Sequence, residues 1–325
     1  GGEIAAHVVG FTNIDDVGQE GIELSFDDWL RGKPGKKKVL KNLYGEIDRD
    51  IMPVAEAVPG RNLRLSIDQR LQFLAYRELK SAISQYQALS GSFVLLDVQT
   101  GEVLAMANQP SYNPNNRIQL DLSSVRNRAV TDVFEPGSTV KPFTVAVALE
   151  SGLDMGYTID TSPGFLKVDD AVIKDPRNRG VLDLGGILAY SSQVGISRLA
   201  LSLNEYDIWK QFQTLGFGEV TGVGFPGESS GFLPNRRRWK DIERVTFAYG
   251  YGLTVTPLQL ASAYSTIASG GIKREVTLIA DQVSEGERVM NARIALQLQS
   301  MLGRVITEGT GQKAAIESYD VGGKT

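Results

Sequence analysis

The feature that most constrains the fold is a long run of helical apolar patterns enclosed by strand-like segments. Helical spacing predominates from Ser138 to Ala268, whereas residues 92–107 hold two short apolar runs separated by a turn at 99–101. Two such runs joined by a turn that contains glycine predict a β-hairpin. The pattern around 319–321 predicts a further strand. Strands in separate segments with helices between them favour the α+β class.

Three other segments carry local predictions. A helix is predicted after Ser66, with Ser66 as its N-cap and Gln69 as the capping-box partner. Its apolar face is marked by Leu71, Leu74, Ala75, Ala82 and Ile83. The basic run at 33–41 is interpreted as a solvated loop or hairpin, and the polar stretch at 108–128 as an ordered loop.

Two rare residue types narrow the chemistry of any catalytic site. The 325 residues include no cysteine and one histidine, His7. Thiol nucleophiles and disulfides are therefore excluded, and a single histidine cannot build a zinc site. We expect no metal and no cofactor. The formal net charge of −4 offers no basic field for nucleic acid, and no apolar run reaches the roughly 18 residues that span a bilayer.

One short motif suits a serine mechanism that needs no histidine. Ser138 and Lys141 stand three residues apart at the start of a predicted helix, and residues at this spacing share a helix face. The helix N-terminus favours a developing oxyanion, and burial lowers a lysine pKa so that the neutral amine can act as a base. By itself, the pattern also occurs by chance at surface helix starts.

The residues around this pair resemble a known family. The segment 134–143, Phe-Glu-Pro-Gly-Ser-Thr-Val-Lys-Pro-Phe, closely resembles the active-serine segment of class B penicillin-binding proteins. Within that family it is most similar to the peptidoglycan D,D-transpeptidases of cell division. Further segments on both sides of it are similar to the same family and occur in the same order, at 11–15, 18–23, 101–108, 112–115, 126–129, 224–228 and 249–252. The resemblance implies the penicillin-binding transpeptidase fold, which is serine β-lactamase-like, with a central antiparallel sheet and helices.

The resemblance also implies a domain organisation. Residues 1–62 are expected to be a remnant of the family's non-catalytic N-terminal pedestal domain, and residues 63–325 the transpeptidase domain. The sequence stops inside the family's third motif, so the C-terminal part of the fold is expected to be missing. We therefore expect this chain, expressed alone, to be unstable or inactive.

Two further family motifs have counterparts in this sequence. The Ser-x-Asn motif is matched at Ser191 and Gln193, where glutamine replaces the family's asparagine. Because glutamine is one methylene longer, its hydrogen bonds to substrate would need a shifted loop. The first two positions of the Lys-Thr/Ser-Gly motif are matched by Lys324 and Thr325. Tyr249 and Tyr251, in another similar segment, are expected either to line the cleft wall or to pack as ordinary aromatic residues.

The resemblance implies acyl transfer on a peptidoglycan stem peptide that ends in D-Ala-D-Ala. Ser138 would attack the penultimate carbonyl while Lys141 accepts the serine proton. Ser191 would relay that proton to the leaving nitrogen, Lys324 would keep the site positive, and Thr325 would bind the substrate carboxylate. β-Lactam antibiotics would acylate the same serine, and His7 would be structural.

Partners and location are likewise implied only by the resemblance. A cell-division transpeptidase would act in the septum, at the periplasmic face of the bacterial inner membrane, held by an N-terminal segment absent from this sequence. Its partners would be a SEDS-family glycan polymerase and other divisome proteins. Two alternatives stay open: a related serine β-lactamase or penicillin sensor, and a catalytically weak penicillin-binding scaffold of the divisome, which Gln193 favours.

Overall fold

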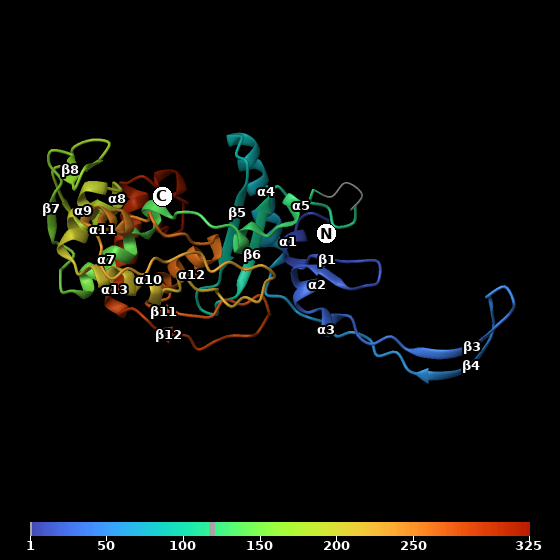
Figure 1. The fold of residues 1–325 in the computed structure, drawn as a ribbon. Coiled ribbons are helices and arrows are strands. Elements are labelled where there is room, and N and C mark those ends of the chain that lie inside the picture. The colour runs from blue at the N-terminus through green and yellow to red at the C-terminus, as the bar shows by residue number, and fades with distance from the viewer. Residues whose placement is uncertain (1, 117–120) are drawn as a thin grey trace.

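The computed structural model describes residues 2–116 and 121–325. Three parts follow one another across the molecule in Figure 1: an N-terminal region, a central β-hairpin with a long helix beside it, and a block of helices. This mixture of helices and antiparallel strand pairs confirms the predicted α+β class.

The N-terminal region consists of short elements and one long hairpin. Its elements are α1 (Ala6–Val9), β1 (Phe11–Thr12), β2 (Gly18–Glu20), α2 (Gly21–Ser25), α3 (Asp27–Leu30), β3 (Lys36–Lys41) and β4 (Ile47–Ala55). Strands β3 and β4 pair antiparallel and project away from the rest of the molecule (Figure 1). Of the two interpretations of the basic run, a solvated loop or a hairpin, the hairpin is therefore confirmed, with the run as its first strand.

Helix α4 (Gln69–Tyr86) begins two residues later than the predicted cap implies. Asp68 is the N-cap, because its carboxylate accepts hydrogen bonds from the backbone N–H groups of Arg70 and Leu71. Ser66 lies outside the helix, and its hydroxyl donates to the carbonyl of Val103 at 2.8 Å. The prediction of Ser66 as the cap is wrong, because a carboxylate directly before the first helical residue satisfies these free N–H groups.

The central hairpin is formed by β5 (Gly91–Leu96) and β6 (Val103–Gln109), as predicted. Ala105 and Ala107 of β6 share an apolar cluster with Ala75 of α4. Val103 and Met106 belong to a second cluster that includes Leu258 of α12 (Pro257–Ala268). The hairpin is thus packed between α4 and the helical block.

The predicted loop at 108–128 is only partly confirmed. Residues 117–120 lie outside the described residues. Asn108 and Gln109 belong to β6, and a short helix, α5 (Leu122–Val125), is formed near the end of the segment. The four-residue α6 (Arg128–Thr131) follows it.

The helical block surrounds the largest apolar core. It contains η1 (Gly137–Val140), α7 (Lys141–Glu150), α8 (Leu184–Ala189), α9 (Gln193–Ser202), α10 (Glu205–Thr214), α11 (Asp241–Ala248), α12 (Pro257–Ala268), α13 (Ala292–Thr307) and η2 (Gln312–Ala314). The same part of the chain also contains three short antiparallel strand pairs. They are β7 (Thr158–Asp160) with β10 (Val181–Asp183), β8 (Phe165–Val168) with β9 (Ala171–Lys174), and β11 (Ile272–Lys273) with β12 (Glu287–Arg288). The helices predicted from Ser138, around 194–203 and at 256–268 are all present.

The strand predicted around 319–321 is not formed. The tail from Tyr319 to Thr325 contains no strand in the described structure. It lies against α13, where the Gly323 N–H donates to the Leu302 carbonyl at 3.3 Å. A strand requires a neighbouring strand for its backbone groups, and the partner of this segment is a helix.

Candidate active site

Ser138 lies in the tight turn that opens α7. Gly137 adopts a φ of +56°, a left-handed conformation that glycine tolerates at little cost. The chain then forms the 3-10 turn η1, in which the Thr139 hydroxyl donates to the Pro136 carbonyl at 2.7 Å. Ser138 is half-buried. The turn therefore presents this serine at the entrance to a helix.

The segment 249–252 packs directly behind this turn. The Gly137 N–H donates to the Gly250 carbonyl at 3.0 Å. A Cβ on Gly250 would come within 2.1 Å of the Gly137 carbonyl oxygen, so only glycine fits there. Tyr249 is buried and Tyr251 is 46 % exposed, with their rings edge to face at 5.7 Å. Tyr251 thus offers a ring to solvent near the serine turn, whereas Tyr249 belongs to the core.

Lys141 is the most unusual side chain of the site, because it is fully buried. Its ammonium donates to the carbonyl of Ser191 at 2.7 Å and to the hydroxyl of Ser191 at 3.2 Å. The pKa of Lys141 is lowered from 10.5 to about 7, mainly by burial and also by the positive charge of Lys324, against an opposing effect of Asp175. With this pKa, about half of the amine is neutral at pH 7 and able to accept a proton. Among the described residues, no hydrogen bond joins Lys141 to Ser138.

Ser191 occupies a strained turn between α8 and α9. Its φ is +55°, a left-handed conformation that serine rarely adopts. The turn is closed by backbone bonds from the N–H groups of Ser191 and Ser192 to the carbonyls of Leu188 and Ile187, at 3.2 and 3.0 Å. In this conformation both the carbonyl and the hydroxyl of Ser191 face Lys141.

Asp175 is a site residue that the sequence reasoning missed. Its carboxylate accepts hydrogen bonds from the Ser192 hydroxyl at 2.5 Å, the Gln193 N–H at 2.6 Å and the Val194 N–H at 3.1 Å. Gln193 is the first residue of α9 and is half-buried. Within the described structure its side-chain amide makes no hydrogen bond, and its contact with Asp175 is through the backbone N–H.

The tail brings Lys324 close enough to Lys141 to affect its pKa. Burial lowers the pKa of Lys324 itself to about 8. Its ammonium donates to the carbonyl of Thr325 at 2.7 Å, and the Thr325 hydroxyl lies 2.7 Å from the hydroxyl of Thr310. Three lysine and serine positions far apart in the sequence, 141, 191 and 324, are thus close together in space.

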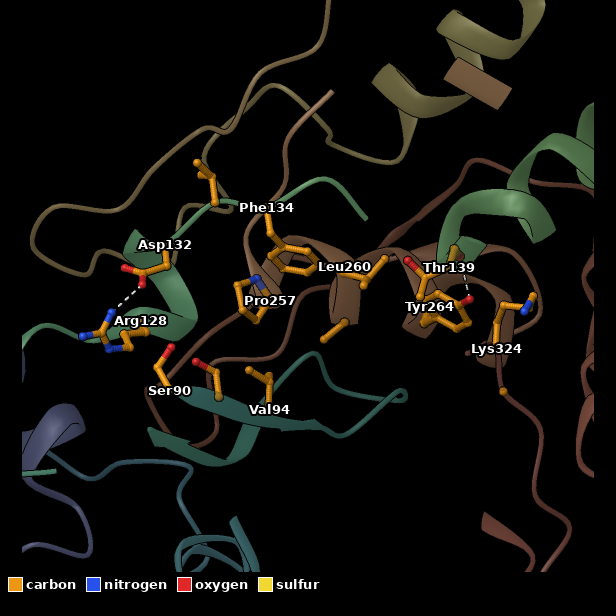
Figure 2. A pocket seen from close by; sticks show the side chains of 14 residues that line it. Ser90, Val94, Arg128, Asp132, Phe134, Thr139, Pro257, Leu260, Tyr264 and Lys324 are labelled. Atoms are coloured by element: carbon orange, nitrogen blue, oxygen red, sulfur yellow. Dashed lines mark hydrogen bonds and ion pairs between the residues drawn. The ribbon is translucent and has the colours of Figure 1, made fainter. Parts of the chain in front are cut away.

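A cavity of about 750 Å³ borders the serine turn (Figure 2). Thr139 and Lys324 line one end of it, and the Tyr264 hydroxyl donates to the Thr139 carbonyl there at 2.7 Å. At the other end Arg128 pairs with Asp132 at 2.8 Å. Strand β5 and helix α12 form the walls between them. The cavity gives a ligand room beside the turn that carries Ser138.

Comparisons with known proteins decide the family. The family model described as "Penicillin binding protein transpeptidase domain" matches residues 91–325. A second family model, "Penicillin-binding Protein dimerisation domain", matches residues 3–65. The chain belongs to the penicillin-binding protein transpeptidase family. This confirms the resemblance that the segment 134–143 indicated.

Curated relatives of this transpeptidase-family chain agree. It is 47 % identical, over its whole length, to the peptidoglycan D,D-transpeptidase FtsI of Escherichia coli, of which the match covers 55 %. It is 40 % identical to the probable peptidoglycan D,D-transpeptidase PbpC of Pseudomonas aeruginosa, over 99 % of this chain and 58 % of the relative. The chain spans about half the length of the curated relatives it matches.

Solved structures agree as well and confirm the fold. Penicillin-binding protein 3 of Mycobacterium tuberculosis matches with a TM-score of 0.86 at 30 % identity, over 98 % of this chain and 73 % of that one. The same protein complexed with aztreonam gives 0.85 at 30 % identity, over 97 % and 72 %. The transpeptidase domain of Burkholderia pseudomallei penicillin-binding protein 3 gives 0.73 at 38 % identity, over 82 % and 77 %.

Three further observations complete the description of this transpeptidase-family chain. Within residues 2–116 and 121–325, no group of acidic or histidine side chains could hold a metal ion. No helix in the same ranges has the length and apolar character of a membrane span. His7 is buried, its Nε2 lies 2.8 Å from the Ser124 carbonyl, and burial lowers its pKa.

Proposed function

We propose that this chain carries the acyl-transfer site of a peptidoglycan D,D-transpeptidase. The observation that carries the proposal is Lys141, which is fully buried, has a pKa lowered to about 7 and stands one helical turn after Ser138. Burying a lysine amine costs folding free energy, and groups with strongly perturbed pKa values cluster at functional sites. Here the amine contacts the carbonyl and the hydroxyl of Ser191 directly.

The reaction then proceeds through a covalent serine intermediate. The neutral Lys141 amine takes the proton of the Ser138 hydroxyl, whose oxygen bonds to the carbonyl carbon of the penultimate D-Ala. The peptide C–N bond breaks, and the proton passes from Lys141 through Ser191 to the leaving nitrogen of D-Ala. The amine of a second stem peptide next attacks the ester, restores the Ser138 hydroxyl and leaves a new peptide cross-link.

The other site residues bind or stabilise. The Ser138 backbone N–H, at the start of a helix, donates to the developing oxyanion. Lys324 keeps the site positive and disfavours protonation of Lys141. Thr325 binds the substrate carboxylate. Gln193 and the exposed ring of Tyr251 contact the peptide. Tyr249, the other tyrosine assigned to substrate, is buried and packs against the ring of Tyr251. β-Lactams resemble the peptide terminus and acylate Ser138 in the same way, and the structure of the aztreonam complex of a relative supports this expectation.

The wider setting is part of the same proposal. Residues 1–62 form part of a pedestal and residues 63–325 belong to the catalytic domain; the matched ranges 3–65 and 91–325 support this division. The proposed role is septal cell-wall synthesis at the periplasmic face of the inner membrane, and the name of the FtsI relative, peptidoglycan D,D-transpeptidase, supports the cell-wall substrate. A SEDS-family polymerase and other divisome proteins are the proposed partners.

Labelling of the full-length protein with fluorescent penicillin, followed by peptide mass mapping, tests the proposal. We expect one covalent adduct, on Ser138, that Ser138→Ala abolishes. Ser84→Ala, on the exposed surface of α4, is the matched control and should label normally. An adduct on another serine would refute the site. Rapid release of the adduct would favour a β-lactamase, and absence of labelling would favour a catalytically weak scaffold.

A further inference from the structure

Asp175 connects a strand pair outside the known motifs to the turn that carries Ser191. It directly follows β9, and its own N–H donates to the Gly164 carbonyl at 3.0 Å, so its backbone is fixed. Its side chain then reaches across to α9, 17 residues further along the sequence. The carboxylate is therefore supplied from an element separate from the helix that it binds.

The carboxylate secures the beginning of α9 from outside. One oxygen accepts from the N–H groups of Gln193 and Val194, and the other from the Ser192 hydroxyl. That hydroxyl in turn accepts from the Gly195 N–H at 2.8 Å. Helix N-termini have free N–H groups, and here the carboxylate and the Ser192 hydroxyl together occupy three of them.

This arrangement fixes the residue just before it. Ser191 has a φ of +55°, and non-glycine residues stay in such a conformation only where their surroundings hold them. On one side Ser191 is followed by the residues that Asp175 binds. On the other side its carbonyl and hydroxyl both accept from Lys141. Asp175 is thus connected to the Lys141 amine in three steps. Asp175 binds the Ser192 hydroxyl, Ser192 directly follows Ser191 in the sequence, and Ser191 binds the amine.

We propose that Asp175 is a positioning residue of the acyl-transfer site, which holds the turn that presents Ser191 to Lys141. The inference rests on the proposed function, because it assigns Asp175 a part in that reaction. Asp175 need not touch the substrate. Removal of the Asp175 carboxylate should slow acylation because Ser191 is then no longer held against the Lys141 amine, even in a variant that keeps the fold.

The negative charge of Asp175 has a second effect that a purely structural residue would lack. It raises the pKa of Lys141, whereas burial and Lys324 lower it; these are the charged groups that act on the amine. Removing the charge should therefore lower the pKa of Lys141. The acid limb of the acylation profile should then move to lower pH.

Acylation of the full-length protein by fluorescent penicillin, measured from pH 5 to 9, tests both effects. We expect Asp175→Ala to lower the acylation rate constant at pH 7 by about tenfold, the equivalent of one charged hydrogen bond. Asp175→Asn should lose less and shift the acid limb downward in pH. Asp175→Glu, which keeps the charge, should leave the limb in place but still acylate slowly. Asp170→Asn, on the exposed turn between β8 and β9, is the matched control and should behave as wild type.

The outcomes separate this inference from the proposed function. If wild type is not acylated, the proposed function fails. If wild type is acylated and the folded Asp175 variants keep its rate and pH profile, the positioning role is refuted. Thermal denaturation establishes folding. Should these variants not fold, Ser192→Ala removes one of the three carboxylate contacts, and a wild-type rate in it would overturn the inference.

Discussion

The pH dependence of acylation follows directly from the buried amine of Lys141. Its pKa is lowered from 10.5 to about 7, chiefly by burial and then by Lys324. Only the neutral amine can accept the proton of Ser138. With a pKa of 7, about 9 % of the amine is neutral at pH 6, half at pH 7 and about 91 % at pH 8. The acylation rate should therefore rise about tenfold between pH 6 and pH 8 and then level off.

The size of the shift matters for the rate as well as for its pH dependence. An unshifted lysine would be neutral in only about 0.03 % of molecules at pH 7. The lowered pKa thus increases the reactive population at neutral pH by roughly a thousandfold. Because Lys324 contributes by charge repulsion, Lys324→Gln should raise the pKa of Lys141 and move the acid limb to higher pH. Lys167→Gln, at an exposed position of β8, should leave it unchanged.

Stopped-flow or gel-based labelling with a fluorescent penicillin measures this rate constant across the range. The carboxylate of the probe stays ionised throughout, so any inflection belongs to the protein. A rate that is flat between pH 6 and pH 8 would show that the Lys141 amine is not the base. A rate that keeps rising towards pH 10 would show that its pKa is not lowered.

Three further predictions concern stability, each measured by thermal or urea denaturation. Gly252→Ala meets open space and should cost only the backbone strain of about 1–2 kcal/mol of unfolding free energy. Gly250→Ala places a Cβ against the carbonyl of Gly137 and should cost about 1–3 kcal/mol more than Gly252→Ala. Equal losses in the two variants would contradict the close packing. Asp68→Ala should cost about 1 kcal/mol through the lost N-cap of α4, and no loss would contradict that cap. Phe143→Ala should cost about 3–5 kcal/mol, since its ring is fully buried between Phe217 and Tyr264; a loss below 1 kcal/mol would contradict that packing.

The sequence predicts well those elements whose signal is local. The β5–β6 hairpin and helix α12 are each encoded by apolar spacing next to a turn or a cap, and both form where predicted. The start of α4 is less well predicted, because Ser66 and Asp68 are both good N-caps and only the path of the chain decides between them. The strand predicted around 319–321 is wrong for a similar reason, since strand formation depends on a neighbouring strand that the local pattern does not reveal.

The site is predictable to the extent that motifs are contiguous. Ser138 and Lys141 are three residues apart, and helix geometry alone relates them. The contact of Lys141 with Ser191 spans 50 residues and that of Asp175 with Ser192 spans 17. Asp175 stands in no motif, and a single aspartate after a short strand carries no signal of its own. Its role emerges only from the packing of β9 against α9.

The glutamine at 193 can be understood from this packing. The turn before α9 is held by two contacts that do not involve the side chain at 193. Lys141 binds Ser191, and Asp175 binds the backbone N–H of Gln193. The contacts that hold this turn are therefore independent of the extra methylene of glutamine, which sets how far the side-chain amide reaches from the backbone. The shifted loop expected for hydrogen bonds from Gln193 to substrate stays a prediction. A difference between glutamine and asparagine at this position should accordingly appear in substrate binding, and the pKa of Lys141 should be indifferent to it.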